Sequence, residues 1–190
     1  MTTILRPSPD FRSLDGLPLI GALAVALTLS SKYGINALVR WPNDVTFQGR
    51  KLAGTLVEAK FLGNTVTSAL LGIGLNANFH AKTIEIENAT TVLDILGSSV
   101  DRAELVSSIL LTLERLYDDA SSGSSKQILD KLKQNEASRG KRVVVQIESG
   151  RLEGILEDYE TLTKVRILED GGTTRSIETS AAISVGYPRV

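Results

Sequence analysis

Turn-forming residues divide the stretch between residues 37 and 75 into short extended segments, and this pattern constrains the fold more than any other. Apolar and β-branched residues fill the segments, while glycine, asparagine and proline separate them. Such runs on either side of a glycine-containing pair are typical of β-hairpins. The expected strands are residues 37–41, 45–47, 51–60 and 66–75, and the expected turns lie at Pro42, Gln48-Gly49 and Gly63-Asn64.

Helices are predicted on both sides of this stretch. A short strand at residues 2–6 precedes a helix at residues 18–33, which Gly34 should end. Nearly every residue in the first three turns of this helix is apolar or small, so it should be packed on more than one side. Further helices are expected at residues 90–96, from Asp101 (with Glu104 completing a capping box) and at residues 126–137.

The last third of the chain has a different pattern of apolar and turn-forming residues. Five short apolar segments are separated by turns such as Ser149-Gly150 and Asp170-Gly171-Gly172. Evenly spaced short strands with glycine-rich turns are typical of a small β-barrel. We predict an α/β (α+β) fold in which a mixed β-sheet flanked by helices fills residues 1–138. An SH3-like C-terminal β-barrel should follow at residues 139–190.

Composition excludes several classes of function. The chain has 190 residues with 21 basic and 22 acidic side chains, so no strong net field attracts nucleic acid or anionic lipid. The absence of cysteine excludes disulfides, thiolate metal sites and cysteine nucleophiles. The most apolar run, residues 17–29, is too short to span a bilayer and lacks the flanks of a signal peptide. A cytoplasmic location is expected, with neither nucleic acid nor a membrane as partner.

Polar groups cluster at the ends of the central strands. Asn43 and Asp44 close one strand, Lys51 follows a tight turn, and Asn76 follows a glycine-spaced strand. A carboxylate, a cation and two amides with small residues between them suit a negatively charged, metal-bound nucleotide. Each feature also has a plainer interpretation, because Pro-Asn-Asp is an ordinary turn sequence and a lysine after a turn is usually solvated.

Taken together, these motifs resemble those of biotin protein ligases. RWPND at 40–44 corresponds to that family's (K/R)WPND, RKLAG at 50–54 to its K-x-x-G hairpin, and GIGLN at 72–76 to its G-x-G-x-N strand end. The resemblance extends over the surrounding helices and the C-terminal barrel. It implies a biotin/lipoate ligase-like core that uses ATP and Mg²⁺ to convert biotin to biotinyl-AMP. The biotinyl group would then pass to a lysine of a biotin carboxyl carrier protein.

The resemblance also implies roles for individual residues. Lys51 and Asp44 would be catalytic, the lysine beside the reacting carboxylate and α-phosphate and the aspartate as ligand of Mg²⁺. Trp41, the only tryptophan, lies inside the motif. We expect its side chain to pack in the core rather than to stack on a ligand. The substrate- and nucleotide-binding residues would be Arg40, Trp41, Asn43, Gly54, Gly72, Gly74 and Asn76.

One family element has no counterpart in the sequence. Biotin protein ligases carry a GRGRxxR loop upstream of the strand at residues 2–6, whereas Arg6 and Arg12 are isolated. We therefore expect a ligase that begins partway through, with its front half supplied by another chain or lost. Two alternatives stay open: a catalytically silent protein that binds biotin, its adenylate or the carrier, and a lipoate ligase-type transferase. A homodimer is a further expectation if no separate chain exists.

Overall fold

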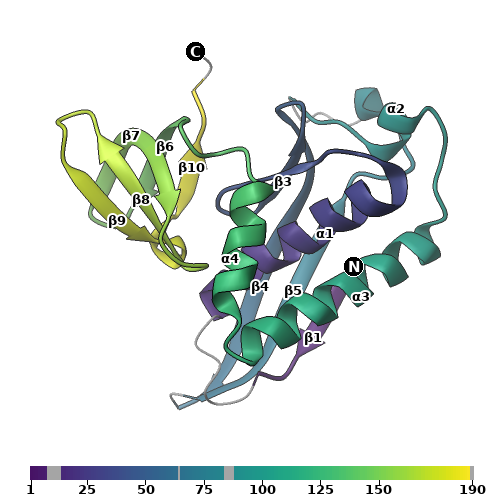
Figure 1. Cartoon of the computed structure of the whole chain (residues 1–190), viewed down its shortest axis with the longest axis horizontal. Coiled ribbons are helices and arrows are strands. Elements are labelled where there is room, and N and C mark those ends of the chain that lie inside the picture. Colours follow the sequence, from purple (N-terminus) through teal and green to yellow (C-terminus); the bar gives the residue numbers. More distant parts are fainter. Residues whose placement is uncertain (8–13, 64, 84–87, 189–190) are drawn as a thin grey trace.

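A five-stranded sheet forms the centre of the larger half of the molecule (Figure 1). The computed structural model describes residues 1–7, 14–63, 65–83 and 88–188, so Asn64 and Arg12 lie outside the described part. The strands run in the order β1-β5-β4-β3-β2. They are β1 (Thr2–Leu5), β2 (Leu38–Arg40), β3 (Asp44–Phe47), β4 (Arg50–Leu62) and β5 (Thr65–Leu75).

The expected mixed sheet is corrected in one respect, because every pairing between these five strands is antiparallel. Strands that follow one another through tight turns pair antiparallel, whereas parallel pairing needs a longer crossover. Parallel contacts among the described residues are two isolated bridges, Val39–Glu136 and Lys51–Ala89. The wider fold class, a sheet flanked by helices and followed by an SH3-like region, is confirmed.

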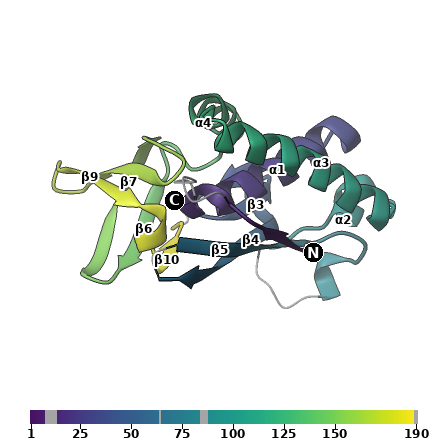
Figure 2. The same ribbon diagram turned by 90° about the horizontal axis from the view of Figure 1, so that it is seen from below.

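Three helices lie on the same side of this sheet, as Figure 2 shows: α1 (Leu17–Tyr33), α3 (Arg102–Ser121) and α4 (Ser125–Gln134). α1 contacts both the strands and α3, so most of its residues are buried, as the sequence predicted. Gly34 ends α1 in the left-handed conformation, with φ 65°. In the part of the chain that the structure describes, no helix is long and apolar enough to cross a membrane.

The predicted helix start at Asp101 is confirmed. Its side chain accepts hydrogen bonds from the backbone N–H groups of Ala103 and Glu104. The Glu104 carboxylate pairs with Lys32 of α1 at 2.6 Å instead of completing a capping box. The cap therefore starts α3, while the glutamate ties α3 to its neighbour. A shorter helix, α2 (Val92–Leu96), precedes α3 and ends at Gly97.

The two edges of the sheet differ. Along β2, the N–H of Val39 donates to the carbonyl of Asn135, and the N–H of Ala137 donates to the carbonyl of Val39, both at 2.8 Å. This pairing explains why α4 ends at Gln134 rather than at residue 137, since the next residues extend along β2 instead. β1 occupies the opposite edge, and none of the other described strands pairs with its outer side.

The C-terminal region is a second five-stranded antiparallel sheet, in the order β10-β6-β7-β8-β9. Its apolar side chains are buried at alternating positions, and among them Val143, Val145 and Ile167 are fully covered. The division of the chain into two domains at residue 138 stays a prediction. The strands are β6 (Arg142–Ile147), β7 (Gly150–Tyr159), β8 (Lys164–Glu169), β9 (Thr174–Glu178) and β10 (Ser184–Gly186).

Trp41 joins the two sheets. Its side chain is 0% exposed, and its indole N–H donates to the hydroxyl of Thr179 at 3.1 Å. Thr179 belongs to a short 3₁₀ turn, η3 (Thr179–Ala181), that precedes β10. The backbone N–H of Trp41 donates to the hydroxyl of Ser138 at 2.8 Å. The indole thus occupies the core, which agrees with the packing interpretation of this residue.

Candidate functional site

The turn at residues 40–44 places an arginine opposite an aspartate. Arg40 ends β2 and Asp44 begins β3, so the Asn–Asp pair does not close one strand, as expected, but leads into the next. The two residues are register partners across the turn, which contains a cis Trp41–Pro42 peptide. An Arg40 Nη atom lies 2.7 Å from Asp44 Oδ2. The sequence predicted both residues for the site, but not their direct pairing.

The β3–β4 hairpin brings Lys51 to the same carboxylate. Gln48 and Gly49 take positive φ angles of 50° and 77°, as expected for a tight hairpin turn. Lys51 Nζ then lies 2.5 Å from Asp44 Oδ1. The side chain of Asp44 is 15% exposed and that of Lys51 42% exposed. One enclosed carboxylate is therefore shared by two cations, and the surplus positive charge faces the more open side, at Lys51.

Glycines leave room beside this cluster. Gly54 is the register partner of both Asp44 and Gly74. A Cβ atom at Gly54 would lie 3.3 Å from Asp44 Oδ1 and 3.4 Å from Lys51 Nζ, tight against both charged groups. Gly72 lies two residues further along β5. Backbone of this kind allows a ligand to approach the strands closely.

These glycines border a hollow of about 440 Å³, referred to below as the glycine hollow. Its lining brings together most of the predicted site: Lys51, Asn43 and all three glycines are part of it. Helices α1, α3 and α4 lie on the other face of the sheet, so they leave this face open to a ligand (Figure 2). The complete lining is Met1, Asn43, Lys51, Gly54, Thr55, Leu56, Gly72, Ile73 and Gly74.

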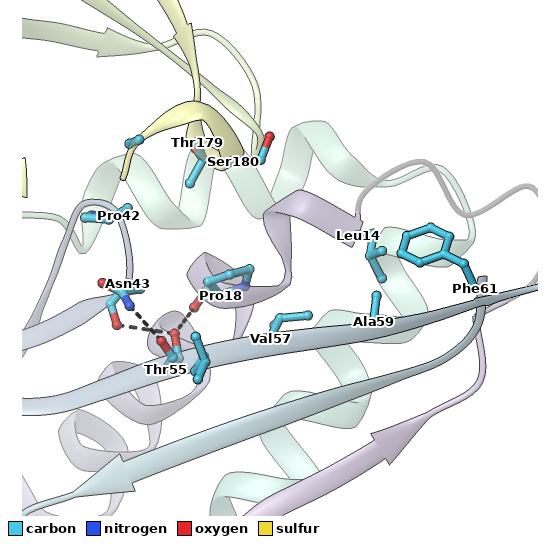
Figure 3. A pocket seen from close by; sticks show the side chains of 12 residues that line it. Leu14, Pro18, Pro42, Asn43, Thr55, Val57, Ala59, Phe61, Thr179 and Ser180 are labelled. Carbon is cyan, nitrogen blue, oxygen red and sulfur yellow. Dashed lines mark hydrogen bonds between the residues drawn. The ribbon is translucent and has the colours of Figure 1, made fainter. Parts of the chain in front are cut away.

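Asn43 anchors the turn to β4. Its side-chain amide donates to the carbonyl of Thr55 at 2.7 Å, and the Thr55 hydroxyl bonds to the carbonyl of Pro18 at 2.8 Å. Figure 3 shows this network at the border of a second hollow, of about 430 Å³, between β4, the start of α1 and η3. One N–H of the Asn43 amide is thus committed to the backbone, and a ligand role for this residue stays a prediction.

Asn76 holds the other end of the site. Its backbone N–H donates to the carbonyl of Leu52 at 2.9 Å, and its side-chain amide donates to the carbonyl of Thr90 at 3.1 Å. The N–H of Thr90 in turn donates to the carbonyl of Lys51 at 2.8 Å. Asn76 therefore fixes the backbone from which Lys51 projects. Asn76 does not line the glycine hollow, and a ligand role for this residue stays a prediction.

Sequence reasoning missed the C-terminal contribution to this site. The hydroxyl of Tyr187 donates to the carbonyl of Trp41, and the Arg40 guanidinium lies 5.3 Å from the centre of the Tyr187 ring. Burial raises the pKa of Tyr187 above its usual range, so the phenol stays neutral. No local pattern could have shown this contact, because Tyr187 lies 146 residues beyond Trp41.

Metal binding can be tested against the donor set. In the described residues, no three histidine or acidic side chains cluster in a way that would hold a metal ion on their own. Mg²⁺ usually binds proteins through one or two carboxylates and takes its other ligands from substrate phosphates and water. Asp44 offers one carboxylate next to Lys51 and Gly54, which line the glycine hollow. The residues present therefore fit a magnesium ion that arrives with a nucleotide.

Comparison with known proteins agrees with this fold. Residues 7–76 match the biotin/lipoate A/B protein ligase family. The chain is 34% identical over 122 residues to the bifunctional ligase/repressor BirA of Bacillus subtilis strain 168, covering 63% of this chain and 38% of that protein. It is 29% identical over 137 residues to the biotin–acetyl-CoA-carboxylase ligase of Mycobacterium tuberculosis, covering 72% of this chain and 48% of that one.

Solved structures show the same fold over almost the whole chain. The apo biotin protein ligase of Aquifex aeolicus superposes with a TM-score of 0.85 and 28% identity, covering 98% of this chain and 81% of that one. The same ligase has been solved with biotin and ATP. The match of residues 7–76 to the ligase family and the likeness of the fold over almost the whole chain make this protein similar to the biotin protein ligases. Its matched part spans only 38% of the length of the Bacillus relatives.

Proposed function

We propose that this chain acts as a biotin–carboxyl-carrier-protein ligase, using ATP to activate biotin and then modifying a lysine of the carrier. The observation that supports this most strongly is the Arg40–Asp44–Lys51 cluster, whose Lys51 lines the glycine hollow. The positive charge of such a site suits the phosphates of ATP. The exposed backbone beside it leaves room for the compact, neutral ring system of biotin. The Aquifex relative solved with biotin and ATP supports the same ligands.

In the first step, a carboxylate oxygen of biotin attacks the α-phosphorus of ATP. The bond to the bridging oxygen breaks, so biotinyl-AMP forms and pyrophosphate leaves. Negative charge gathers on the α-phosphate oxygens during this exchange. The ammonium group of Lys51 lies at the open side of the cluster, where it can stabilise that charge. Arg40 replaces the lysine that the family more often carries, and it keeps the cation with a planar fork.

Asp44 would hold Mg²⁺ together with the nucleotide phosphates, and the ion would neutralise phosphate charge and orient the leaving group. The chain's own contribution is to fix the carboxylate between Arg40 and Lys51, so that it is already oriented when the nucleotide binds. Asn43 and Asn76 keep the two strand ends in place, and Gly54, Gly72 and Gly74 admit the ligand to the backbone.

In the second step, the carrier lysine supplies the nucleophile. Its amine attacks the acyl carbon of biotinyl-AMP, the bond to AMP breaks, and the amine loses one proton. No serine, cysteine or histidine nucleophile is needed. The single histidine, His80, agrees with this, because it lies at the surface and pairs with Asp94 at 2.7 Å.

We propose further that a second polypeptide, carrying the arginine- and glycine-rich loop, pairs with the outer edge of β1, which no other described strand occupies. An unpaired edge strand invites a further strand. Beside β1, an apolar groove of about 440 Å³ runs along α3, where Leu110 and Leu111 are partly exposed. Leu5 of β1 lines the same groove. Co-expression with such a polypeptide should give a co-purifying pair. A homodimer through this edge is the alternative outcome.

The test of the ligase proposal compares Lys51→Ala with Lys60→Ala, an exposed lysine further along the same strand. Loss of one transition-state charge contact should cost about 3–4 kcal/mol in biotin-dependent pyrophosphate exchange, with stability changed by within about 0.5 kcal/mol. Lys60→Ala should match wild type. Without the upstream polypeptide, we expect exchange to be weaker by several powers of ten, so calorimetric titration of biotin and of Mg·ATP supplies a second readout.

Three results would count against this assignment. Equal binding of both ligands to wild type and Lys51→Ala would show that Lys51 does not contact either ligand and that the binding contacts lie elsewhere. Binding without exchange, even in the presence of the upstream polypeptide, would favour the catalytically silent alternative. Exchange that depends on lipoate instead of biotin would assign the chain to the lipoate-type alternative.

A further inference from the structure

The C-terminal segment after β10 reaches back to the turn of the proposed site. The Tyr187 hydroxyl donates to the backbone carbonyl of Trp41 at 2.5 Å and lies 3.1 Å from the hydroxyl oxygen of Ser138. Its ring lies against Arg40, with the guanidinium carbon 5.3 Å from the ring centre, within the range of a cation–π contact. One side chain therefore holds both the backbone of the turn and the side chain that precedes it.

Arg40 depends on that ring for its position. A cavity of about 310 Å³ lies between the turn and β10, and Arg40, Asp44, Ile183 and Tyr187 are among the residues that line it. A long side chain beside such a space has room for other rotamers. Among the described residues, no hydrogen-bond partner meets the Nε atom of Arg40. The Asp44 carboxylate and the aromatic ring are thus its main restraints.

Displacement of Arg40 would change the charge that faces the ligand. Asp44 divides its two oxygens between Arg40 and Lys51. If Arg40 turned away, the whole carboxylate could pair with Lys51. The ammonium group would then be held by Asp44 and less able to meet a phosphate oxygen. The contacts form a continuous chain from Tyr187 through Arg40 and Asp44 to Lys51.

We infer that Tyr187 is a positioning residue that keeps Arg40 on Asp44 and so leaves Lys51 available to an anionic ligand. This inference rests on the proposed function. Tyr187 is not part of the lining of the glycine hollow and acts through Arg40 rather than on the ligand. It makes the C-terminal region a component of nucleotide binding, in addition to its role in packing on Trp41.

The experiment compares Tyr187→Leu and Tyr187→Phe with Thr179→Val in the full chain. Thr179→Val removes another hydrogen bond between the C-terminal region and Trp41, without touching Arg40, so it is a matched control. Tyr187→Leu should weaken Mg·ATP binding roughly tenfold in calorimetric titration, and Tyr187→Phe, which keeps the ring, by about threefold. Biotin affinity should change in neither variant, and Thr179→Val should bind both ligands like wild type.

A second readout needs no ligand. The rate at which an amine-selective reagent labels Lys51, measured by peptide mass spectrometry against Lys60, should fall in Tyr187→Leu, because Asp44 then engages the ammonium fully. Simple loosening of the turn would raise the rate instead, so a faster or unchanged rate overturns the inference. An equal loss of Mg·ATP binding in Thr179→Val would also overturn it. If wild type binds neither ligand, the proposed function fails. The labelling rates then still test whether Tyr187 acts on Lys51 through Arg40 and Asp44.

Discussion

The two faces of the β4–β5 pair show opposite uses of the same strands. On the covered face, Leu71 and Thr55 pack against α1 so closely that a Cβ atom at Gly21 would lie 3.2 Å from Leu71 and 3.3 Å from Thr55. On the open face, Gly54 stands opposite Gly74, and Gly72 stands opposite Leu56, which is 62% exposed. Bulky side chains fill the first face, and glycine leaves the second face bare.

This contrast separates stability from function along a single strand. Because successive side chains point to opposite faces, neighbours such as Leu71 and Gly72 lie in different environments. Substitutions on the covered face should act through packing and leave the site intact in the folded molecules. Substitutions on the open face should act on charge and space at the site and leave the core intact.

Leu71→Ala should have the largest effect on stability. The side chain is fully buried against α1, and removal of a buried leucine side chain typically costs about 2–5 kcal/mol. Urea unfolding followed by circular dichroism measures the loss. The affinity of the folded protein for Mg·ATP should be unchanged. A loss of affinity beyond the unfolded fraction would show that the covered face also shapes the site.

Asp44→Asn should separate charge from shape on the open face. The amide keeps the size of the carboxylate but loses its negative charge, so Mg²⁺-dependent nucleotide binding should weaken by about 1–3 kcal/mol. The affinity for biotin should stay close to that of wild type. Calorimetric titration of ATP with and without EDTA checks the assignment. If chelation weakens ATP binding equally in wild type and variant, Asp44 does not act through the metal.

Local signals in the sequence predicted much of the fold, and the physics of turns explains why. Gly34 and Asp101 mark helix boundaries through their own backbone geometry and hydrogen bonds, and the Gln48-Gly49 turn is defined by its positive φ angles. These features depend on neighbours in the chain. The early end of α4 was not predicted, because it arises from pairing with β2, a segment far away in the sequence.

The site was predictable only as a set of residue types. Spacing brought Asp44, Lys51 and Gly54 together correctly, since one hairpin carries them all. The pairing of Arg40 with Asp44 depends on the turn geometry, which the sequence alone did not reveal. The contact with Tyr187 depends on how the C-terminal sheet docks against Trp41. Long-range packing of that kind leaves no periodic trace in one sequence.

Gly54→Ala should act on the open face through space alone. The new Cβ atom would lie 3.3 Å from Asp44 Oδ1 and 3.4 Å from Lys51 Nζ, so the ion pair must shift. We expect Mg·ATP affinity to fall roughly tenfold, about 1.4 kcal/mol, with little change in the free energy of unfolding. Gly171→Ala is the matched control, because it makes the same change outside the glycine hollow, at a glycine where a Cβ atom would meet nothing within 4 Å. Equal effects of both variants would contradict the role given to the ion pair.

Leu56→Ala should have the smallest effect and gives the sharpest comparison with Leu71→Ala. The two residues are of the same type and lie on adjacent strands, but Leu56 is 62% exposed and Leu71 is fully buried. An exposed side chain away from structural features usually contributes within about 0.5 kcal/mol to stability. Urea unfolding of the two variants side by side measures the difference. A loss for Leu56→Ala comparable to that for Leu71→Ala would mean that the open face is covered in solution, and that its glycines serve close packing against another surface rather than access for a ligand.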